Sequence, residues 1–434
     1  MSQSSSESLI AHITAKQDDL AALQDACNAA AEHERGAVVA ALETICRSGK
    51  GNVAVRSAQF NYLIHHKELL ERQRANPSPY NGVSLDDTRF QAVRPEIAQW
   101  QSLTKEWLAL KPDSYSGLYM RALSLLADHP AQAVEPLFAK LRAFKRADLP
   151  SITHFDGAFH RSLEALAEDA VAFMPECSSV RDAGAHERFM FSACDYAYFE
   201  KYGMQMMASL RRHDANGGFH LHLFDTTDAE AKAVAARLCD MGLEGVSLSR
   251  EWTGLRTETG TRGTASEAAR AYYHVARFYR FWQFLRARPG VAGWQLDADS
   301  LFNGGIDGLF ERLDSHDMSI WLLPGRAEPH NKFAAGLLGI APTAPGRRYL
   351  QRVAGYVADC VKANVIPWGT DQTILYAVYV GMADEAIAPS LGPVTASIFD
   401  GQCNEGAAIW PGKCDIQSPN YSNFKQLLLS LRAA

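Results

Sequence analysis

The spacing of hydrophobic residues divides the chain into two regions of different character. Over about the first 175 residues, apolar side chains recur at i, i+3 and i+4, the period of an amphipathic helix. Proline-containing or polar breaks at 76–81, 111–114 and 128–130 separate the periodic segments. We therefore predict an all-α accessory region over residues 1–180. Its predicted helices cover residues 8–27, 34–47, 55–74, 95–110, 115–127 and 131–145.

From residue 185 onward, short apolar runs alternate with helical periodicity. The predicted strands are 188–192, 219–224, 246–248 and 291–296, and the predicted helices are 198–213, 228–241, 266–287 and 372–380. A loop rich in Gly and Thr at 253–264 has the length of a lid or a binding loop. Strands that alternate with helices predict an α/β domain over 185–434, with a mostly parallel, Rossmann-like sheet. Ligands of such sheets bind beyond the carboxyl ends of the strands, where Asp195 and Asp297 are expected.

Composition narrows the class of protein. The 434 residues are 47% hydrophobic and 21% charged, which is typical of globular domains with a sizeable core. A net charge of −6 argues against a nucleic-acid-binding protein. The start of the chain, MSQSSSESLIAHITAKQDD, lacks a cationic stretch followed by an apolar core, and no uninterrupted apolar run reaches the length of a membrane span. We expect a cytoplasmic protein without a transmembrane segment, and peripheral membrane contact stays open.

The eight cysteines contain no C-x-x-C pair, so a zinc ribbon is not expected. Cys403 and Cys414 are close enough in sequence to form a disulfide. Because the protein is expected to be cytoplasmic, reduced thiols are the prediction.

Two carboxylates, Asp297 and Asp299, follow the apolar segment 291–296 in "LDADSLF". In an extended segment, residues i and i+2 point the same way, so the two carboxylates can converge on one hard divalent cation. Such a cation would offset the cost of burying charge and would stabilise a departing diphosphate. A polar turn after a strand is the simpler alternative.

Four stretches of the α/β region carry a family resemblance. They are, in chain order, FSACDYAYFEKYGMQMMASLRRH, AYYHVARFYRFWQFL, LDADSLF, and KFAAGLLGI followed by WGTDQTIL. In this order they resemble nucleotide-sugar-dependent glycosyltransferases of the GT-A fold. The resemblance is to the retaining family that includes glycogenin and the bacterial lipopolysaccharide galactosyltransferases. It implies a UDP-sugar donor, Mn²⁺ or Mg²⁺, and a glycan or another hydroxyl acceptor. The helical region would then recognise the acceptor or hold a homo-oligomer together.

The resemblance also implies roles for single residues. In the donor and metal site they are, in chain order, the nucleotide contacts Ala193, Asp195 and Tyr198, the donor contact Arg277, the cation and diphosphate contacts Asp297, Ala298 and Asp299, the catalytic sugar-pocket residues Asp371 and Gln372, the third metal ligand Asp400 and the diphosphate contact Lys413. Two positions depart from the family pattern. The family's C-terminal histidine ligand has no counterpart, because His330 is the last histidine, and Asp400 is preferred to Asn404 in its place. Ala334 stands where the family has a sugar-binding asparagine.

Simpler interpretations of these residues stay open. Asp371 could be the N-cap of the helix 372–380. Arg277 and Arg280 are three residues apart on one helix face, either as a solvated pair or as a phosphate clamp. His220 and His222 alternate along a strand and are expected to be structural rather than metal ligands.

Two other functions compete with sugar transfer. "LDADSLF" is also similar to the nucleophile motif of haloacid-dehalogenase-like phosphatases, in which Asp297 would attack phosphate and Asp299 would act as acid and base. That motif belongs on the first strand of its domain, whereas three predicted strands precede it in this chain. A non-enzymatic scaffold is the other alternative, although it gives no reason to keep both carboxylates. The sequence therefore predicts a metal-dependent glycosyltransferase.

Overall fold

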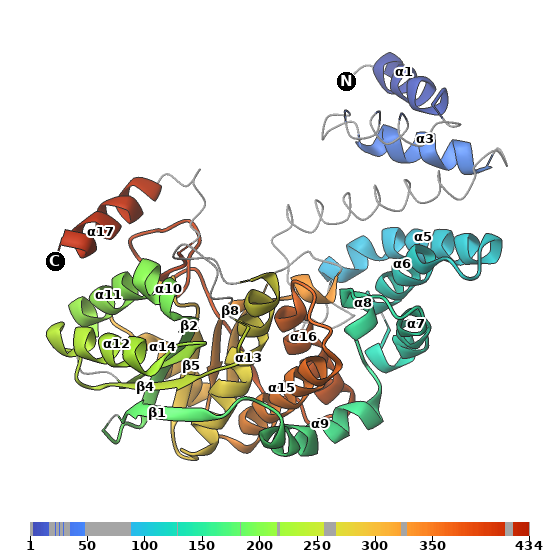
Figure 1. The fold of residues 1–434 in the computed structure, drawn as a ribbon. Coiled ribbons are helices and arrows are strands. Elements are labelled where there is room, and N and C mark those ends of the chain that lie inside the picture. Colours follow the sequence, from blue (N-terminus) through green and yellow to red (C-terminus); the bar gives the residue numbers. More distant parts are fainter. Residues whose placement is uncertain are drawn as a thin grey trace. The chain divides into compact units, whose positions relative to one another are not determined.

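The computed structural model describes residues 3–16, 22, 26, 29, 35–47, 88–127, 129–182, 184–214, 218–255, 266–322, 328–412 and 420–433 (Figure 1). The predicted helix 55–74, residues 256–264 of the Gly- and Thr-rich loop, Lys413 and Cys414 lie outside these residues. The chain forms two compact units. One consists of Met1–Arg146, Thr153–Phe155 and Leu323–Lys332, and the other of Ala147–Ile152, Asp156–Leu322 and Phe333–Ala434. The division of roles between residues 1–180 and 185–434 stays a prediction.

The smaller unit is helical in its described part. Its helices are α1 (Gln3–Thr14), α3 (Arg35–Arg47), α5 (Thr88–Leu110), α6 (Tyr115–Leu126) and α7 (Ala131–Ala143). Apolar residues at helical spacing, such as Val38, Leu42 and Ile45 of α3, are buried against α1. The side chain of Ser114 caps α6 by accepting a hydrogen bond from the backbone N–H of Gly117. The predicted helices 34–47, 115–127 and 131–145 are thus confirmed within one or two residues at each end.

The larger unit is an α/β domain built on one eight-stranded sheet. Its strands are β1 (Cys177–Arg181), β2 (Arg188–Asp195), β3 (Gly218–Phe224), β4 (Val246–Glu251), β5 (Ala292–Leu296), β7 (Met318–Leu322), β8 (Phe333–Ile340) and β9 (Leu391–Pro393), with β6 (Leu301–Phe302) and β10 (Ile409–Trp410) forming a separate pair. Its helices are α8 (Leu149–Ile152), α9 (Gly157–Asp169), α10 (Tyr196–Tyr198), α11 (Met204–Asp214), α12 (Asp228–Asp240), α13 (Glu267–Arg286), α14 (Asp307–Ser315), α15 (Ala344–Ala363), α16 (Thr370–Asp384) and α17 (Tyr421–Ala433). The predicted α/β class is confirmed.

The strand order β1-β4-β3-β2-β5-β8-β7-β9 creates a switch point in the middle of the sheet. From β2 the chain moves outward through β3 and β4, and then crosses back to place β5 on the other side of β2. These four strands are parallel to one another, whereas β1 and β8 run antiparallel to their neighbours. Crevices for ligands form at such a point, outside the carboxyl ends of the two strands that diverge. Asp195 ends β2 and Asp297 follows β5 directly, so both lie at this crevice.

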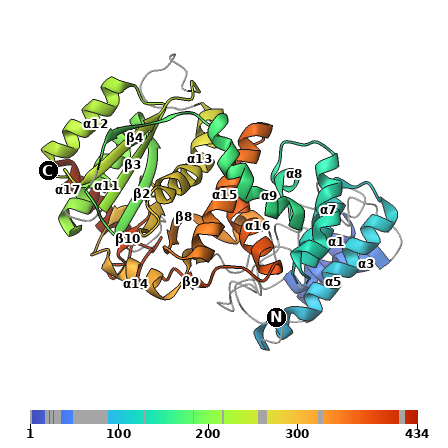
Figure 2. The same ribbon diagram turned by 90° about the horizontal axis from the view of Figure 1, so that it is seen from below.

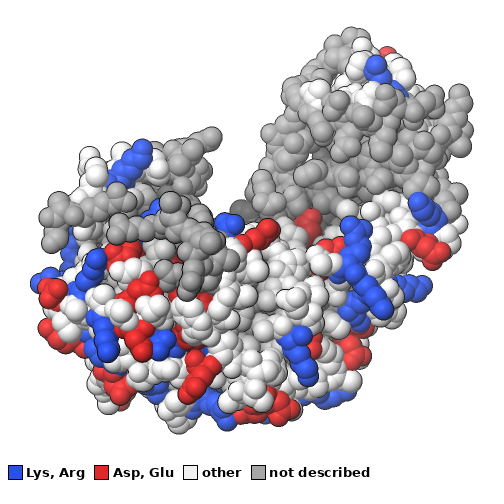
Figure 3. Space-filling model, in the orientation of Figure 1, with Lys and Arg blue, Asp and Glu red and all other residues white. Residues whose placement is uncertain are grey.

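Helices cover both faces of the sheet. Figures 1 and 2 show α11, α12 and α14 on one face and α13, α15 and α16 on the other. The first face carries an apolar core, to which β3 contributes Phe219, Leu221 and Leu223. The alternate residues of β3, His220 and His222, are therefore directed to the α13 face, as the pleat requires. Figure 3 shows acidic and basic side chains interspersed over the one face of this unit that it displays.

Several elements differ from their predicted bounds. The predicted helix 198–213 is two helices, α10 and α11, joined by a π-helical turn at Phe199–Gly203. Gly203 permits that turn, because a Cβ there would lie 2.6 Å from the ring of Phe199. The strand β1 was missed because its sequence, CSSVR, is polar and mostly exposed. No described helix is both long and apolar enough to cross a membrane.

Candidate functional site

Arg277 of α13 connects the elements that meet at the crevice. Its guanidinium forms ion pairs with Asp297, after β5, and with Asp371 of α16, the latter with Nη2 3.0 Å from Oδ2. Nη2 also donates to the backbone carbonyl oxygen of Ala335 in β8, at 3.2 Å. Burial alone would lower the pKa of Arg277, but the charges of Asp297 and Asp371 raise it above its usual value. Arg277 therefore stays cationic and fixes two carboxylates from distant segments.

Asp299 is held from the β2 side of the crevice. The hydroxyl of Tyr198 donates to Oδ2 of Asp299 at 2.7 Å. Tyr198 is itself positioned by Asp195, whose Oδ1 accepts the backbone N–H of Tyr198 at 2.6 Å as the N-cap of α10. Burial and the charge of Asp299 raise the pKa of Tyr198, so its hydroxyl remains a donor. The structure thus brings together Asp195, Tyr198 and the two aspartates of "LDADSLF".

The N-cap of α16 is Gly369, and the interpretation of Asp371 as the N-cap is wrong. Gly369 adopts φ 88°, a left-handed conformation that favours glycine, and the helix begins at Thr370. Asp371 therefore lies in the first turn, where its Oδ1 accepts the N–H of Gln372 at 2.8 Å and its Oδ2 binds Arg277. A carboxylate is favourable at this end of the helix dipole.

The alternative of a solvated arginine pair is wrong as well. Arg277 is 7% exposed and Arg280 is 3% exposed. Arg280 pairs with Glu251 of β4 rather than with the residues around Arg277. The helical spacing placed the two arginines on one side of α13, but each reaches a different strand.

Two glycines allow backbone to approach the aspartates closely. A Cβ on Gly336 of β8 would lie 3.3 Å from Oδ2 of Asp297. A Cβ on Gly412 would lie 2.1 Å from the backbone oxygen of Asp299 and 2.5 Å from its Cβ. The absence of a side chain at Gly336 leaves room beside the Asp297 carboxylate, and its absence at Gly412 lets that backbone pack against Asp299, a signal that sequence reasoning missed.

The remaining predicted residues are placed as follows. Ala298 is buried in the apolar core, and Ala193 is half-buried on β2. The side chain of Gln372 is half-buried and has no hydrogen bond to another described side chain. Asp400 is buried, with its carboxylate accepting the N–H of Gln402 at 2.9 Å and the N–H of Asn404 at 3.1 Å. The roles predicted for these residues, and for Lys413 outside the described part, stay predictions.

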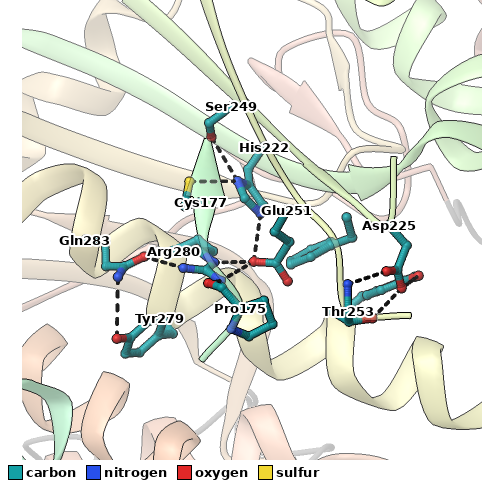
Figure 4. Close-up of polar contacts among 12 residues, drawn as sticks. Pro175, Cys177, His222, Asp225, Ser249, Glu251, Thr253, Tyr279, Arg280 and Gln283 are labelled. Carbon is teal, nitrogen blue, oxygen red and sulfur yellow. Dashed lines mark hydrogen bonds and ion pairs between the residues drawn. The ribbon is translucent and has the colours of Figure 1, made fainter. Parts of the chain in front are cut away.

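The Gly- and Thr-rich loop follows β4, and its first residues are held by Asp225 at the end of β3. Asp225 has φ 44°, unusual for a residue other than glycine, and is fully buried. Its Oδ1 accepts the N–H group of Thr253 at 2.6 Å (Figure 4). The same atom accepts the N–H of Gly254 at 3.0 Å, and the hydroxyl of Tyr273 donates to Oδ2 at 2.7 Å. The start of the loop is therefore tied to α13, one helical turn from Arg277.

The two aspartates at the crevice suit a hard cation. Among the described residues no group of three His, Cys, Asp or Glu side chains could hold a metal by itself. Mg²⁺ and similar ions commonly take one or two carboxylates and complete their coordination with substrate phosphates and water. The Asp297 side chain is 40% exposed, and Gly336 leaves space beside its Oδ2. The donor set therefore fits a cation that is shared with a diphosphate.

Cys403 is disulfide-bonded, which corrects the prediction that it would be reduced. It is fully buried beside Leu301, Trp410 and Phe424, in a turn held by Asp400. The prediction rested on the expected compartment alone. Cys414, the partner considered from sequence, is outside the described residues.

Comparison with known proteins gives matches in structure only. No protein-family model matches the sequence, and no curated protein matches it. The structure is similar to the glycosyltransferase GlyE of Streptococcus pneumoniae TIGR4, with a TM-score of 0.35 and 15% identity over 58% of this chain and 61% of the GlyE chain. It is similar to the galactosyltransferase LgtC, with a TM-score of 0.37 and 15% identity over 56% of this chain and 95% of LgtC. It is also similar to the bifunctional glycosyltransferase WbbM, with a TM-score of 0.35 and 13% identity over 59% of this chain and 52% of WbbM.

These matches agree with the predicted resemblance to glycosyltransferases. At such TM-scores and identities, however, they carry no weight for the activity or the substrates of this chain. The activity has to rest on its own residues.

Proposed function

We propose that this protein is a metal-dependent glycosyltransferase that takes its sugar from a UDP-sugar. The observation that carries the proposal is the position of Arg277, which joins Asp297 and Asp371 at the switch point of the sheet. Buried charges such as Arg277 and Asp371 are costly at the carboxyl edge of a parallel sheet unless they serve a ligand or a structural network. The partial exposure of Asp297 favours a ligand.

In this proposal each side chain has a definite task. Asp297 and Asp299 supply the protein oxygens that hold Mn²⁺ or Mg²⁺ against the donor diphosphate. Tyr198 orients the Asp299 carboxylate through its hydroxyl, and Asp195 fixes the turn that carries Tyr198. Arg277 holds the Asp297 carboxylate in one orientation from the α13 side.

The sugar would lie on the opposite side of the crevice. Asp371 and Gln372 lie in the first turn of α16, and Asp371 contacts Arg277. A sugar whose diphosphate is held at Asp297 would therefore extend toward them. When bound, the cation supplies Lewis-acid stabilisation to the departing diphosphate. The protein's contribution is to position the anomeric carbon for attack by an acceptor hydroxyl. The all-α region over 1–180 is proposed to recognise the acceptor or to form a homo-oligomer.

The test is a thermal-shift measurement on the full chain. UDP-glucose, UDP-galactose and GDP-mannose are each added with Mn²⁺ or with EDTA. We expect one UDP-sugar to raise the melting temperature with Mn²⁺ and not with EDTA, because binding to the native state stabilises it. The double variant Asp297→Asn/Asp299→Asn should lose this shift entirely.

A matched control removes the same charge elsewhere. Asp307 and Asp314 are exposed residues of α14, so Asp307→Asn/Asp314→Asn should keep the full shift. If no nucleotide-sugar stabilises the wild-type chain, or if both double variants respond alike, the donor site is wrongly assigned. Metal-dependent phosphate release from simple esters, blocked by beryllium fluoride, would instead support the phosphatase. The absence of both responses would support a non-enzymatic scaffold.

A further inference from the structure

A second cluster of ionisable residues crosses three strands at the β1 edge of the sheet. Cys177 of β1 lies opposite Glu251 of β4, and His222 of β3 lies opposite Ser249 of β4. Directly paired residues share a face of the sheet, as do residues i and i+2 of a strand. The thiol, the imidazole and the carboxylate therefore lie together on the face covered by α13 (Figure 4).

The contacts follow the order thiol, imidazole, carboxylate. The Sγ atom of Cys177 is 4.0 Å from Nδ1 of His222. On the other side of the ring, Nε2 of His222 is 3.3 Å from Oε2 of Glu251. A nucleophile beside a base, with the base oriented by a third group, is the arrangement that activates cysteine side chains.

Residues of α13 fix the carboxylate end of this chain of contacts. Arg280 forms an ion pair with Oε2 of Glu251, and the hydroxyl of Tyr272 donates to Oε1 at 2.9 Å. Arg280 also donates to the carbonyl oxygen of Pro175 at 2.6 Å, two residues before the cysteine. The same arginine therefore ties β4 to the segment that carries Cys177.

Exposure differs sharply along the cluster. The side chains of His222 and Glu251 are 1% and 0% exposed, whereas Cys177 is exposed. The charged groups are shielded from water, and Cys177 is the member of the cluster that lies at the surface. A reagent can therefore approach the cluster at Cys177, whereas the imidazole and the carboxylate behind it are enclosed.

We propose that Cys177 is a site of thiol modification that reacts as a thiolate with low-molecular-weight disulfides. The Cys177 proton moves to Nδ1 of His222, and the thiolate attacks one sulfur of the disulfide. A new S–S bond forms to Cys177, the original S–S bond breaks, and the departing thiolate takes up the proton. This modification does not depend on the proposed sugar transfer.

The electrostatic surroundings are consistent with this reaction. Burial acts to raise the pKa of Cys177, but the hydrogen bond and charge of His222 and the charge of Arg280 lower it below its usual value. Burial acts to lower the pKa of His222, but Cys177 and Glu251 raise it. The groups that face the pair are Ser249 and Glu251 from β4, His220 from β3, and Tyr272 and Arg280 from α13.

The chain contains its own reference thiol. Cys239 of α12 is free and exposed like Cys177. Its sulfur accepts a hydrogen bond from Arg181 at 3.2 Å, and no histidine contact to it occurs among the described residues. Rates at the two cysteines can therefore be compared within one molecule.

The experiment treats the full chain with oxidised glutathione between pH 6 and pH 8.5, stops the reaction with acid, and measures each cysteine-containing peptide by mass spectrometry. At pH 7 we expect Cys177 to form the mixed disulfide about tenfold faster than Cys239 or more. Toward pH 6 an ordinary thiol loses about tenfold in rate per pH unit, and Cys177 should lose clearly less. Equal rates and equal pH slopes at the two cysteines would overturn the proposal.

Two variants separate the role of His222 from general packing. His222→Asn keeps an amide near the position of Nδ1 but cannot take up a proton, and should reduce the Cys177 rate to about that of Cys239. His220→Asn alters the neighbouring buried histidine, which contacts Ser247 and shares Ser249 with His222, and should change the Cys177 rate far less than His222→Asn does. An unchanged Cys177 rate in folded His222→Asn would contradict the proposal. If that variant does not fold, the wild-type pH slopes decide the question alone.

Discussion

Helix α13 carries two buried arginines three residues apart, and their surroundings differ in one respect. Arg277 binds Asp297 and Asp371, and Arg280 binds Glu251. The side chain of Asp297 is 40% exposed, whereas that of Glu251 is fully buried. The residues around Arg277 form an open cluster, which water reaches at the carboxyl edge of the sheet. The residues around Arg280 form a closed cluster, which reaches the surface only at Cys177.

This difference shows how one residue type on one helix can serve two purposes. Around Arg280 each carboxylate oxygen has a partner inside the protein, so the ion pair joins β4 to α13. Around Arg277 the Asp297 carboxylate remains partly accessible to solvent, and Gly336 leaves room beside it. An incompletely enclosed carboxylate beside a fixed cation is what a ligand site requires, whereas a fully enclosed one indicates a structural role.

The largest expected effect comes from replacing each arginine with methionine. Arg280→Met leaves the buried Glu251 carboxylate without its main partner and should lower the free energy of unfolding by about 3–5 kcal/mol. Arg277→Met should cost about 1–3 kcal/mol, because water can reach Asp297 and the buried Asp371 keeps the N–H of Gln372 as a partner. Urea unfolding of both variants measures the two losses. Equal losses would show that exposure does not distinguish the clusters.

The same comparison shows what could be predicted from sequence. Asp195 and Asp297 were predicted to lie together because the carboxyl ends of parallel strands meet at one edge, and alternating strands and helices predict that edge. Arg277 and "KFAAGLLGI" were assigned to the same site only through the family resemblance, and the structure places Gly336 beside Asp297, whose N–H its carbonyl oxygen accepts at 3.1 Å. Local patterns and one topological rule were therefore sufficient for the two aspartates alone.

Other contacts could not be predicted, since they depend on the exact positions of distant segments. The spacing of Arg277 and Arg280 shows that they share a helix face, but not that one reaches α16 and the other β4. Glu251 lies beyond the predicted end of its strand, and Cys177 lies on a polar strand without an apolar pattern. The sequence separation between these two residues gives no sign that they are paired in register.

Acid should affect the closed cluster through Glu251. Burial acts to raise the pKa of this carboxyl, but His222 and Arg280 lower it by more than burial raises it, so the net shift of the pKa is downward. A carboxylate with a lowered pKa stabilises the folded state above its unfolded pKa, near 4.5, and this contribution is lost as the pH falls through the folded value. The difference in unfolding free energy between the wild type and Glu251→Gln should therefore narrow from pH 6 to pH 3.5. A constant difference over this range, measured by urea unfolding, would contradict an ionised Glu251.

The smallest effect, and the most specific, comes from two tyrosines that each donate to a carboxylate. Tyr198 donates to Asp299 at 2.7 Å in the open cluster, and Tyr272 donates to Glu251 at 2.9 Å in the closed one. Each Tyr→Phe change removes one hydrogen bond to a charged group and should cost about 1–3 kcal/mol of stability.

The effects of the two tyrosine variants on the donor site should differ. Loss of a residue that orients a metal ligand weakens metal binding by about tenfold or more, so Tyr198→Phe should need that much more Mn²⁺ to reach the donor-induced thermal shift. Tyr272→Phe should leave the Mn²⁺ requirement unchanged, because Glu251 belongs to the other cluster. If both variants shift the Mn²⁺ requirement alike, the two arginine clusters act as one unit, and Asp299 loses its separate assignment to the metal.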